Sequence, residues 1–200
     1  MKKMQGYNRP MTLVVLAGGQ SRRMGCDKAL LPVGARTLLE ETIRPLADLF
    51  DEVLIVVSSG QRIPLPAGRA GRVVEDEIAG QGPLRGILTG LRAAEHDACF
   101  FLACDMPGLS AGVVRKIADQ SAAVEIAIAV TDRSLKEPLL GLYKKSVIPE
   151  IEGLLASGER SILALIDRVR TREVFLRVDE IPLNINTPDE YKTLIERRKP

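Results

Sequence analysis

Short apolar runs alternate along this chain with segments in which apolar residues recur at helical spacing. The runs lie at residues 12–17, 53–57, 72–74, 98–103, 124–130, 137–143 and 173–178. Amphipathic segments begin near residues 38, 83, 110, 147, 161 and 187, the first running from Leu38 to Phe50. Strands buried on both faces of a parallel sheet read as continuous apolar runs. The pattern therefore predicts an α/β fold around a doubly wound, mostly parallel sheet with right-handed crossovers.

Capping residues mark where several of these helices begin. Ser110 has a side chain preferred at an N-cap, and Pro83 suits the first turn of a helix. The sequence Thr187-Pro188-Asp189-Glu190 predicts a capping box with proline at the first helical position. Gly158 is expected to separate the helix that begins near residue 147 from a short helix starting at Ser161.

Length and charge limit the class of protein. The 200 residues suit one domain, and we expect a disordered leader over residues 1–10 and a single domain over 11–200. The net charge of +2 argues against a strongly basic nucleic-acid-binding protein. No apolar window approaches the roughly 20 residues of a membrane-spanning helix. The three cysteines include no CxxC pair, so we expect a reducing, cytoplasmic location.

A glycine-rich segment with three cationic side chains follows the first apolar run. It reads LAGGQSRRMGCDK over residues 16–28. Glycines let a backbone approach a ligand closely, and exposed N–H groups of such loops cradle phosphate oxygens. The side chains of Arg23 and Lys28 suit a polyanion. The segment is neither a GxxxxGKS/T loop nor a GxGxxG fingerprint, and it predicts a grip for a nucleoside triphosphate.

A candidate metal ligand follows another strongly apolar run. Asp105 comes directly after the run at 98–103, within Cys104-Asp105-Met106-Pro107. Sheets of this kind bind ligands at the carboxyl ends of their strands, so Asp105 and the glycine-rich segment are expected to form one site. Mg²⁺ takes one or two carboxylates together with phosphate oxygens and waters. Asp105 is therefore predicted to bind Mg²⁺.

Three further polar features have both a functional and a structural interpretation. Asp76 follows the short run at 72–74, where it suits a ribose hydroxyl or a base, or simply belongs to a solvated acidic face. Gly82 and Pro83 lie in a second glycine-rich stretch, which is either a helix entry or a ligand wall. Asn184 and Asn186 share one side of an extended backbone, where they suit a polar heterocycle or support of the metal.

Four segments resemble, in this order, those of the MobA-like nucleotidyltransferases. They are LAGGQSRRMGCDKALLP, EDEIAGQGPLRG, ACDMP and NINTPDEY, and the similarity extends from about residue 13 to about residue 194. The resemblance implies a three-layer, Rossmann-like α/β fold with a mostly parallel sheet, of the nucleotide-diphospho-sugar transferase type. It also implies transfer of GMP from GTP to the phosphate of molybdopterin, with Mg²⁺ as cofactor and release of pyrophosphate.

The resemblance further implies roles for individual residues. Lys28 would lie on the phosphates with Arg23 nearby, and Asp105 would bind Mg²⁺ and the nucleotide, so these three are the implied catalytic residues. Relatives often carry asparagine where this chain has Ser58, a departure that affects the nucleoside contact. Residues 131–137 are less recognisable and carry no implied role. The implied nucleotide-binding set is Leu16, Ala17, Gly18, Gly19, Lys28, Ser58, Asp76 and Asp105, and the implied acceptor-binding set is Asn184, Asn186, Gly82 and Pro83.

The sequence leaves other functions open. Cytidylyl transfer to molybdopterin, or nucleotidyl transfer to a sugar phosphate, uses the same chemistry with another base or acceptor. A non-catalytic nucleotide-binding adaptor has no need of both Lys28 and Asp105, and a dinucleotide-dependent oxidoreductase is disfavoured by the missing GxGxxG. Because the implied product is labile, contact with a molybdoenzyme or its chaperone is expected.

Overall fold

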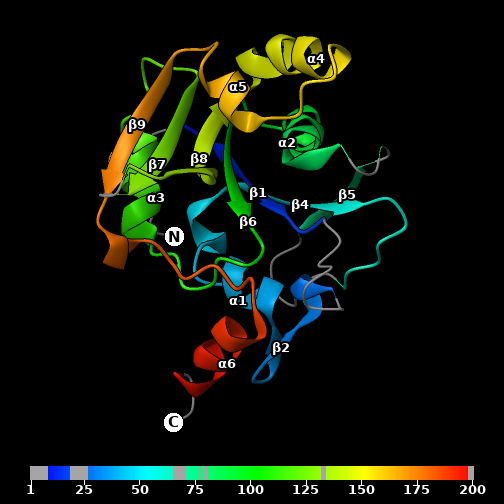
Figure 1. Ribbon diagram of the computed structural model, residues 1–200, viewed down its shortest axis with the longest axis vertical. Helices are drawn as coiled ribbons and strands as arrows, with labels where there is room; N and C mark the ends of the chain where they lie inside the picture. Colours follow the sequence, from blue (N-terminus) through cyan, green and yellow to red (C-terminus); the bar gives the residue numbers. More distant parts are fainter. Residues whose placement is uncertain are drawn as a thin grey trace.

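The computed structural model describes residues 9–18, 27–64, 71–76, 78, 81–131 and 134–197. At its centre is a seven-stranded sheet with the strand order β5-β4-β1-β6-β8-β7-β9 (Figure 1). All six residues of β1 and of β7 are buried, as expected for strands covered on both faces. The strands of the sheet are β1 (Met11–Leu16), β4 (Glu52–Ser58), β5 (Arg72–Asp76), β6 (Ala98–Ala103), β7 (Ile126–Thr131), β8 (Lys136–Lys144) and β9 (Thr171–Leu176).

Helices cover both faces of this sheet, which gives the molecule three layers. Helices α1 and α3 pack on one face, and α2, α4 and α5 pack on the other (Figure 1). Alternate residues of each strand serve the two cores, with Leu13 in the first and Val14 in the second. The predicted three-layer Rossmann-like architecture is confirmed. The helices are α1 (Leu38–Ile43), α2 (Gly82–Ala93), α3 (Ala111–Asp119), α4 (Ile148–Ala156), α5 (Ile162–Ile166) and α6 (Pro188–Glu196).

One strand of the sheet runs against the others. β8 pairs antiparallel with both β6 and β7, whereas β1 pairs parallel with β4 and β6, β4 with β5, and β7 with β9. Only residues 132–135 separate β7 from β8. A parallel crossover needs about a dozen residues or more, so this connection allows only a hairpin. The sheet is therefore mostly parallel, as predicted.

The first helix is shorter than its apolar spacing predicts. α1 ends at Ile43, and the chain continues through a turn into the short 3₁₀ helix η2 (Ala47–Leu49). Pro45 explains this correction, because proline inside a helix lacks the N–H donor and clashes with the preceding turn. Leu46 and Phe50 are nevertheless buried in the core, so the spacing identified the inward side chains correctly.

The predicted helix starts are confirmed. The Ser110 hydroxyl accepts a hydrogen bond from the N–H of Val113 at 3.3 Å. Thr187 and Glu190 form the reciprocal bonds of a capping box at the start of α6. Ser161 caps α5, and Gly158 follows α4 with a φ of +85°, a value that favours glycine.

A small third cluster, absent from the sequence-based prediction, lies beside the main body. Val33, in the hairpin of β2 (Pro32–Val33) and β3 (Arg36–Thr37), is buried together with Leu38 and Ile185. Three side chains of α6 pack against this cluster, those of Tyr191, Leu194 and Ile195. The Tyr191 hydroxyl also donates to the carbonyl of Pro32. This cluster brings the segment before α6 next to the segment that follows the glycine-rich stretch.

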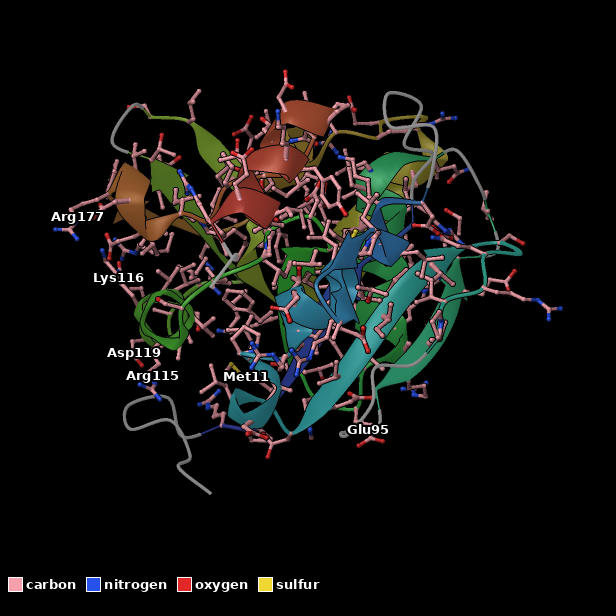
Figure 2. All side chains as sticks on the ribbon, turned by 90° about the horizontal axis from the view of Figure 1, so that it is seen from below. Met11, Glu95, Arg115, Lys116, Asp119 and Arg177 are labelled. Atoms are coloured by element: carbon pink, nitrogen blue, oxygen red, sulfur yellow. The ribbon has the colours of Figure 1, made fainter. Side chains whose placement is uncertain are left out.

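Polar and apolar side chains separate as in a water-exposed globular domain. Lys116 and Asp119 of α3 are exposed and project at the periphery, as does Arg177 (Figure 2). In the described ranges, no helix combines the length and apolarity needed to cross a membrane.

Cys99 and Cys104 are buried free thiols, and burial raises the pKa of each to about 12. Both thiols therefore stay protonated at neutral pH and serve packing.

Candidate active site

The strand order creates a topological switch point between β1 and β6. β4 and β5 extend the sheet on one side of β1, and β6 continues it on the other, so the winding reverses there. Doubly wound sheets bind ligands at the carboxyl ends of the strands at such a point. Leu16, the last residue of β1, is opposite Ala103, and its carbonyl accepts from the N–H of Cys104 at 3.1 Å. The glycine-rich segment and Asp105 therefore leave the sheet side by side.

The exit from β1 passes very close to the end of β4. The N–H groups of Ala17 and Gly18 both donate to the carbonyl of Val56, at 2.8 and 3.1 Å. A Cβ atom on Gly18 would lie 2.9 Å from both the backbone nitrogen and the hydroxyl oxygen of Ser58. Glycine is therefore required at position 18, and Ser58 lies directly beside the predicted nucleotide-binding backbone.

Lys28 joins two of the other predicted site residues. It begins the short 3₁₀ helix η1 (Lys28–Leu30), which Asp27 caps through its side chain. Lys28 Nζ lies 3.1 Å from Asp105 Oδ2 and donates to Asn186 Oδ1 at 2.7 Å. The Lys28 and Asp105 side chains are only 16% and 18% exposed, so solvent screens their interaction less than a surface ion pair. Three segments that are distant in sequence thus meet at one ammonium group.

The capping box of α6 aims Asn186 at Lys28. Glu190 accepts hydrogen bonds from the N–H groups of Asn186 and Thr187, at 2.7 and 2.8 Å. These bonds, led by the one from Asn186, lower the pKa of the Glu190 carboxyl. Ile185 is buried between the two asparagines, and its N–H donates to the carbonyl of Asp105 at 2.9 Å. The segment 184–186 forms no strand, but the alternation of polar and apolar residues there matches the burial pattern, in which only Ile185 of the three is buried.

Two side chains in the region of Lys28 carry oxygen atoms that suit a hard cation as ligands. The carboxylate of Asp105 is one of them. The other is Asn184 Oδ1, which is buried and lacks a hydrogen-bond partner among the described residues, although a buried carbonyl oxygen is normally paired. A carboxylate and an amide oxygen are ligands that Mg²⁺ accepts. The described residues contain no group of three or more His, Cys, Asp or Glu side chains arranged to hold a metal.

A second carboxyl group, on β8, faces the same region. Burial raises the pKa of Glu137, and the negative charge of Asp105 raises it further. The sequence analysis carried no role over to residues 131–137 and so missed this group. The only available signal was its place at the start of an apolar run.

Asp76 lies at the same edge of the sheet but away from Asp105. It ends β5 opposite Ser58 of β4, and its Oδ1 is 3.3 Å from Nε of Arg85. Gly82, with a φ of +73°, and Pro83 open α2 and are exposed. The structure thus groups Asp76 with the start of α2 and not with the Lys28 cluster.

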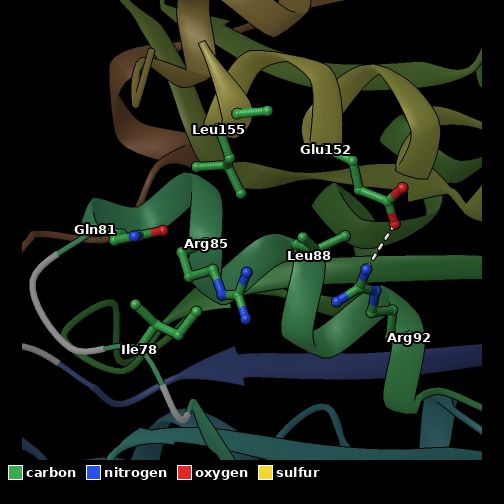
Figure 3. Close-up of a pocket in the computed structure, with 8 residues that line it drawn as sticks. Ile78, Gln81, Arg85, Leu88, Arg92, Glu152 and Leu155 are labelled. Atoms are coloured by element: carbon green, nitrogen blue, oxygen red, sulfur yellow. Dashed lines mark hydrogen bonds and ion pairs between the residues drawn. The ribbon is translucent and has the colours of Figure 1, made fainter. Parts of the chain in front are cut away.

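A hollow of about 270 Å³ lies between α2 and α4 (Figure 3). Each of its two arginines forms an ion pair with a carboxylate. Arg85 pairs with Asp76, and Arg92 pairs with Glu152, with 2.7 Å between Arg92 Nη2 and Glu152 Oε1. None of the residues predicted to bind nucleotide or acceptor lines it. The lining residues are Ile78, Gln81, Arg85, Leu88, Arg92, Glu152, Leu155 and Ala156.

The predicted site residues fall into three groups. Lys28 contacts both Asp105 and Asn186, and Asn184 precedes Ile185, whose N–H donates to the carbonyl of Asp105. Leu16, Ala17, Gly18 and Ser58 form the neighbouring strand ends, with Asp76, Gly82 and Pro83 further along. Gly19 and Arg23 lie outside the described residues.

The sequence matches a known protein family over most of its length. A family model described as the MobA-like NTP transferase domain matches residues 13–173. A protein of Carboxydothermus hydrogenoformans named "Probable molybdenum cofactor guanylyltransferase" is 33% identical over 195 residues, which cover 93% of this chain and 95% of that protein.

Solved structures share the fold. Molybdopterin-guanine dinucleotide biosynthesis protein A from Archaeoglobus fulgidus superimposes with a TM-score of 0.71 and 24% identity, covering 93% of this chain and 97% of that one. The Rv0371C protein of Mycobacterium tuberculosis, solved in complex with manganese, gives a TM-score of 0.66 and 21% identity, with 94% and 98% covered. These likenesses confirm the predicted fold type.

Proposed function

Because this chain belongs to the MobA-like NTP transferase family, we propose that it transfers GMP from GTP to the phosphate of molybdopterin. The observation that carries the proposal is the contact of Lys28 with Asp105, 77 residues away in sequence, at the ligand-binding edge of the sheet. A cation and a carboxylate held together there suit a nucleoside triphosphate with its metal ion. The name of the Carboxydothermus relative supports guanosine as the nucleoside.

The proposed reaction is a displacement at the α-phosphorus of GTP. A terminal oxygen of the molybdopterin phosphate forms a bond to this phosphorus. The bond from the α-phosphorus to the oxygen that bridges to the β-phosphate breaks, and pyrophosphate leaves with the electron pair. A phosphate monoester is already ionised near neutral pH, since its second pKa is about 6. The nucleophile therefore needs no general base.

The barrier to this reaction is largely electrostatic, because an anion must approach a polyanion. Catalysis then depends on positioning and on charges that are already in place. Two unit charges about 4 Å apart interact by about 4 kcal/mol at an effective dielectric constant of about 20. Lys28, with most of its side chain buried, supplies such a charge beside the phosphates. Arg23 is proposed to add a second.

Asp105 and Asn184 are the residues proposed to hold Mg²⁺. Their oxygens fit this ion, and the lone buried oxygen of Asn184 is otherwise unexplained. When bound, Mg²⁺ supplies positive charge that offsets the negative charge of the phosphates. The Lys28 ammonium group, 3.1 Å from Asp105 Oδ2, offsets the charge of that carboxylate.

The remaining residues are proposed to form two binding walls. The backbone of residues 16–19, with Ser58 and Asp76, lines the nucleoside. Asn184 and Asn186 are proposed to face the acceptor from beside Lys28, and Gly82 and Pro83 are proposed to face it from the start of α2, further along the same edge. Because Asn186 accepts a hydrogen bond from the same ammonium group that contacts Asp105, the acceptor wall adjoins the phosphates, as the transfer requires. We further expect the reaction to run in the cytoplasm and its product to pass to a molybdoenzyme or its chaperone.

The test is an incubation with molybdopterin, Mg²⁺ and each of the four nucleoside triphosphates in turn. GTP is expected to yield equal amounts of pyrophosphate and of a guanine dinucleotide detected by mass spectrometry. Preferential use of CTP would replace guanylyl by cytidylyl transfer, and turnover only with a sugar phosphate would replace the acceptor. Binding of nucleotide without pyrophosphate release would overturn the assignment as an enzyme.

A further inference from the structure

Gln61 belongs to a tight turn that follows β4. The N–H of Gln61 donates to the carbonyl of Ser58 at 3.0 Å, which closes the four-residue turn. Gly60, the third residue of this turn, has a φ of +74°, a conformation that favours glycine. The turn therefore returns the chain toward β1 and carries the Gln61 side chain with it.

Glu75 of β5 holds this turn from the other side. Its Oε1 accepts hydrogen bonds from the Ser59 hydroxyl and the Gly60 N–H, each at 2.7 Å. These two bonds lower the pKa of the Glu75 carboxyl, so the carboxylate is ionised at neutral pH. The turn is thus tied to the sheet before Gln61 makes any contact of its own.

The side-chain amide of Gln61 joins three segments. Its oxygen accepts from the N–H of Ser58 at 3.0 Å. Its nitrogen donates to the carbonyl of Ala17 at 3.1 Å and to Asp27 Oδ2 at 2.5 Å. Ala17 and Asp27 lie near the two ends of the glycine-rich segment of residues 16–28, so a single amide group contacts both ends of that segment.

Asp27 connects Gln61 to the short helix that begins at Lys28. While Oδ2 of Asp27 accepts from Gln61, Oδ1 accepts from the N–H of Ala29 at 3.0 Å and so caps η1. Lys28 lies in the sequence between Asp27 and Ala29, the two residues that one of these bonds joins. The direction in which its side chain leaves the backbone, toward Asp105 and Asn186, is therefore set by Asp27 and, through Asp27, by Gln61.

We propose that Gln61 is a positioning residue for nucleotidyl transfer, which gathers the two ends of the glycine-rich segment and orients Lys28 toward the phosphates. This inference rests on the proposed function. Gln61 touches none of the reacting groups and acts through Asp27. Misplacement of a catalytic group by an ångström lowers turnover by up to about 10²-fold.

Two substitutions separate positioning from general stability. Gln61→Glu is nearly isosteric but loses the donor and sets a carboxylate against that of Asp27. Asp27→Asn sets an amide donor against the Gln61 donor. In the double variant Q61E/D27N, the amide at position 27 again donates to the carboxylate at position 61, so one hydrogen bond returns in the reverse direction. Gln120→Glu, on an exposed residue after α3, makes the same chemical change away from the site.

Each variant is measured for kcat and KM with GTP, for thermal midpoint, and for hydrogen exchange of the Ala29 N–H. Q61E and D27N are each expected to lower kcat/KM by about 10- to 100-fold and to speed exchange at Ala29. The double variant is expected to recover part of both losses, and Q120E is expected to match the native protein.

Losses in kcat/KM that simply multiply in the double variant would overturn the proposal, because the partners would then act independently. A rescue of the thermal midpoint without any rescue of kcat/KM would overturn it too, since Gln61 would then serve folding alone. If the native protein transfers no nucleotide at all, the proposed function fails. The exchange at Ala29 still reports whether Gln61 holds Asp27.

Discussion

Replacing Lys28 by alanine is expected to lower kcat/KM for guanylyl transfer by about 10²–10³-fold, the loss typical of one preorganised electrostatic group. The ammonium group is in contact with Asp105 and Asn186 and is largely shielded from water. Its removal leaves the phosphates without the cation that is held in place before they arrive. Steady-state kinetics with GTP and molybdopterin measures the effect.

Lys116→Ala is the matched control for this prediction. Lys116 forms an ion pair with Glu180 at 3.3 Å, but on the outer side of α3 (Figure 2). Its loss changes the net charge by the same amount and is expected to leave kcat/KM near the native value. Equal activity losses in the two variants would show that overall charge matters and that the position of Lys28 does not.

Replacing Asp105 by asparagine is expected to lower kcat/KM by a similar factor, about 10²–10³-fold, and to weaken the dependence of the rate on Mg²⁺. Asparagine keeps the shape of the side chain and an oxygen that accepts from Lys28. The variant therefore removes the negative charge with little change in packing. Initial rates over a titration of Mg²⁺ separate weaker metal use from slower chemistry.

The same change at the opposite end of the same strand is the control. Asp97 directly precedes β6, whereas Asp105 lies just beyond its carboxyl end, and Asp97 is exposed. Asp97→Asn is expected to transfer GMP at the native rate with an unchanged Mg²⁺ response. A native Mg²⁺ response in Asp105→Asn would remove Asp105 from the metal site.

The shared location of Lys28 and Asp105 follows from simple rules applied to the sequence. Asp105 comes shortly after one continuous apolar run, the glycine-rich segment that ends at Lys28 begins at the end of another, and parallel strands gather their carboxyl ends at one edge. The rules place the two side chains in the same region, and the structure puts them 3.1 Å apart. The shortened α1 and the antiparallel β8 were also accessible, through Pro45 and the four-residue connection between β7 and β8.

The role of Gln61 was not accessible from the sequence. A single polar residue after a strand is typical of any turn, and two of its partners, Ala17 and Asp27, lie on segments whose approach depends on tertiary structure. The alternation around Ile185 predicted that the two asparagines share a side. It did not predict that Asn186 would accept a hydrogen bond from Lys28, because the docking of α6 on the hairpin β2–β3 determines that contact.

The most direct test of the central claim, attack on the α-phosphorus at the Lys28–Asp105 edge, follows the fate of each phosphate of GTP. The native protein is incubated with molybdopterin and Mg²⁺ and with GTP radiolabelled at either the α- or the γ-phosphate. The label from the α-phosphate is expected in the pterin product, and the label from the γ-phosphate is expected in pyrophosphate. Transfer of the γ-label to the pterin, or its release as inorganic phosphate, would contradict the account.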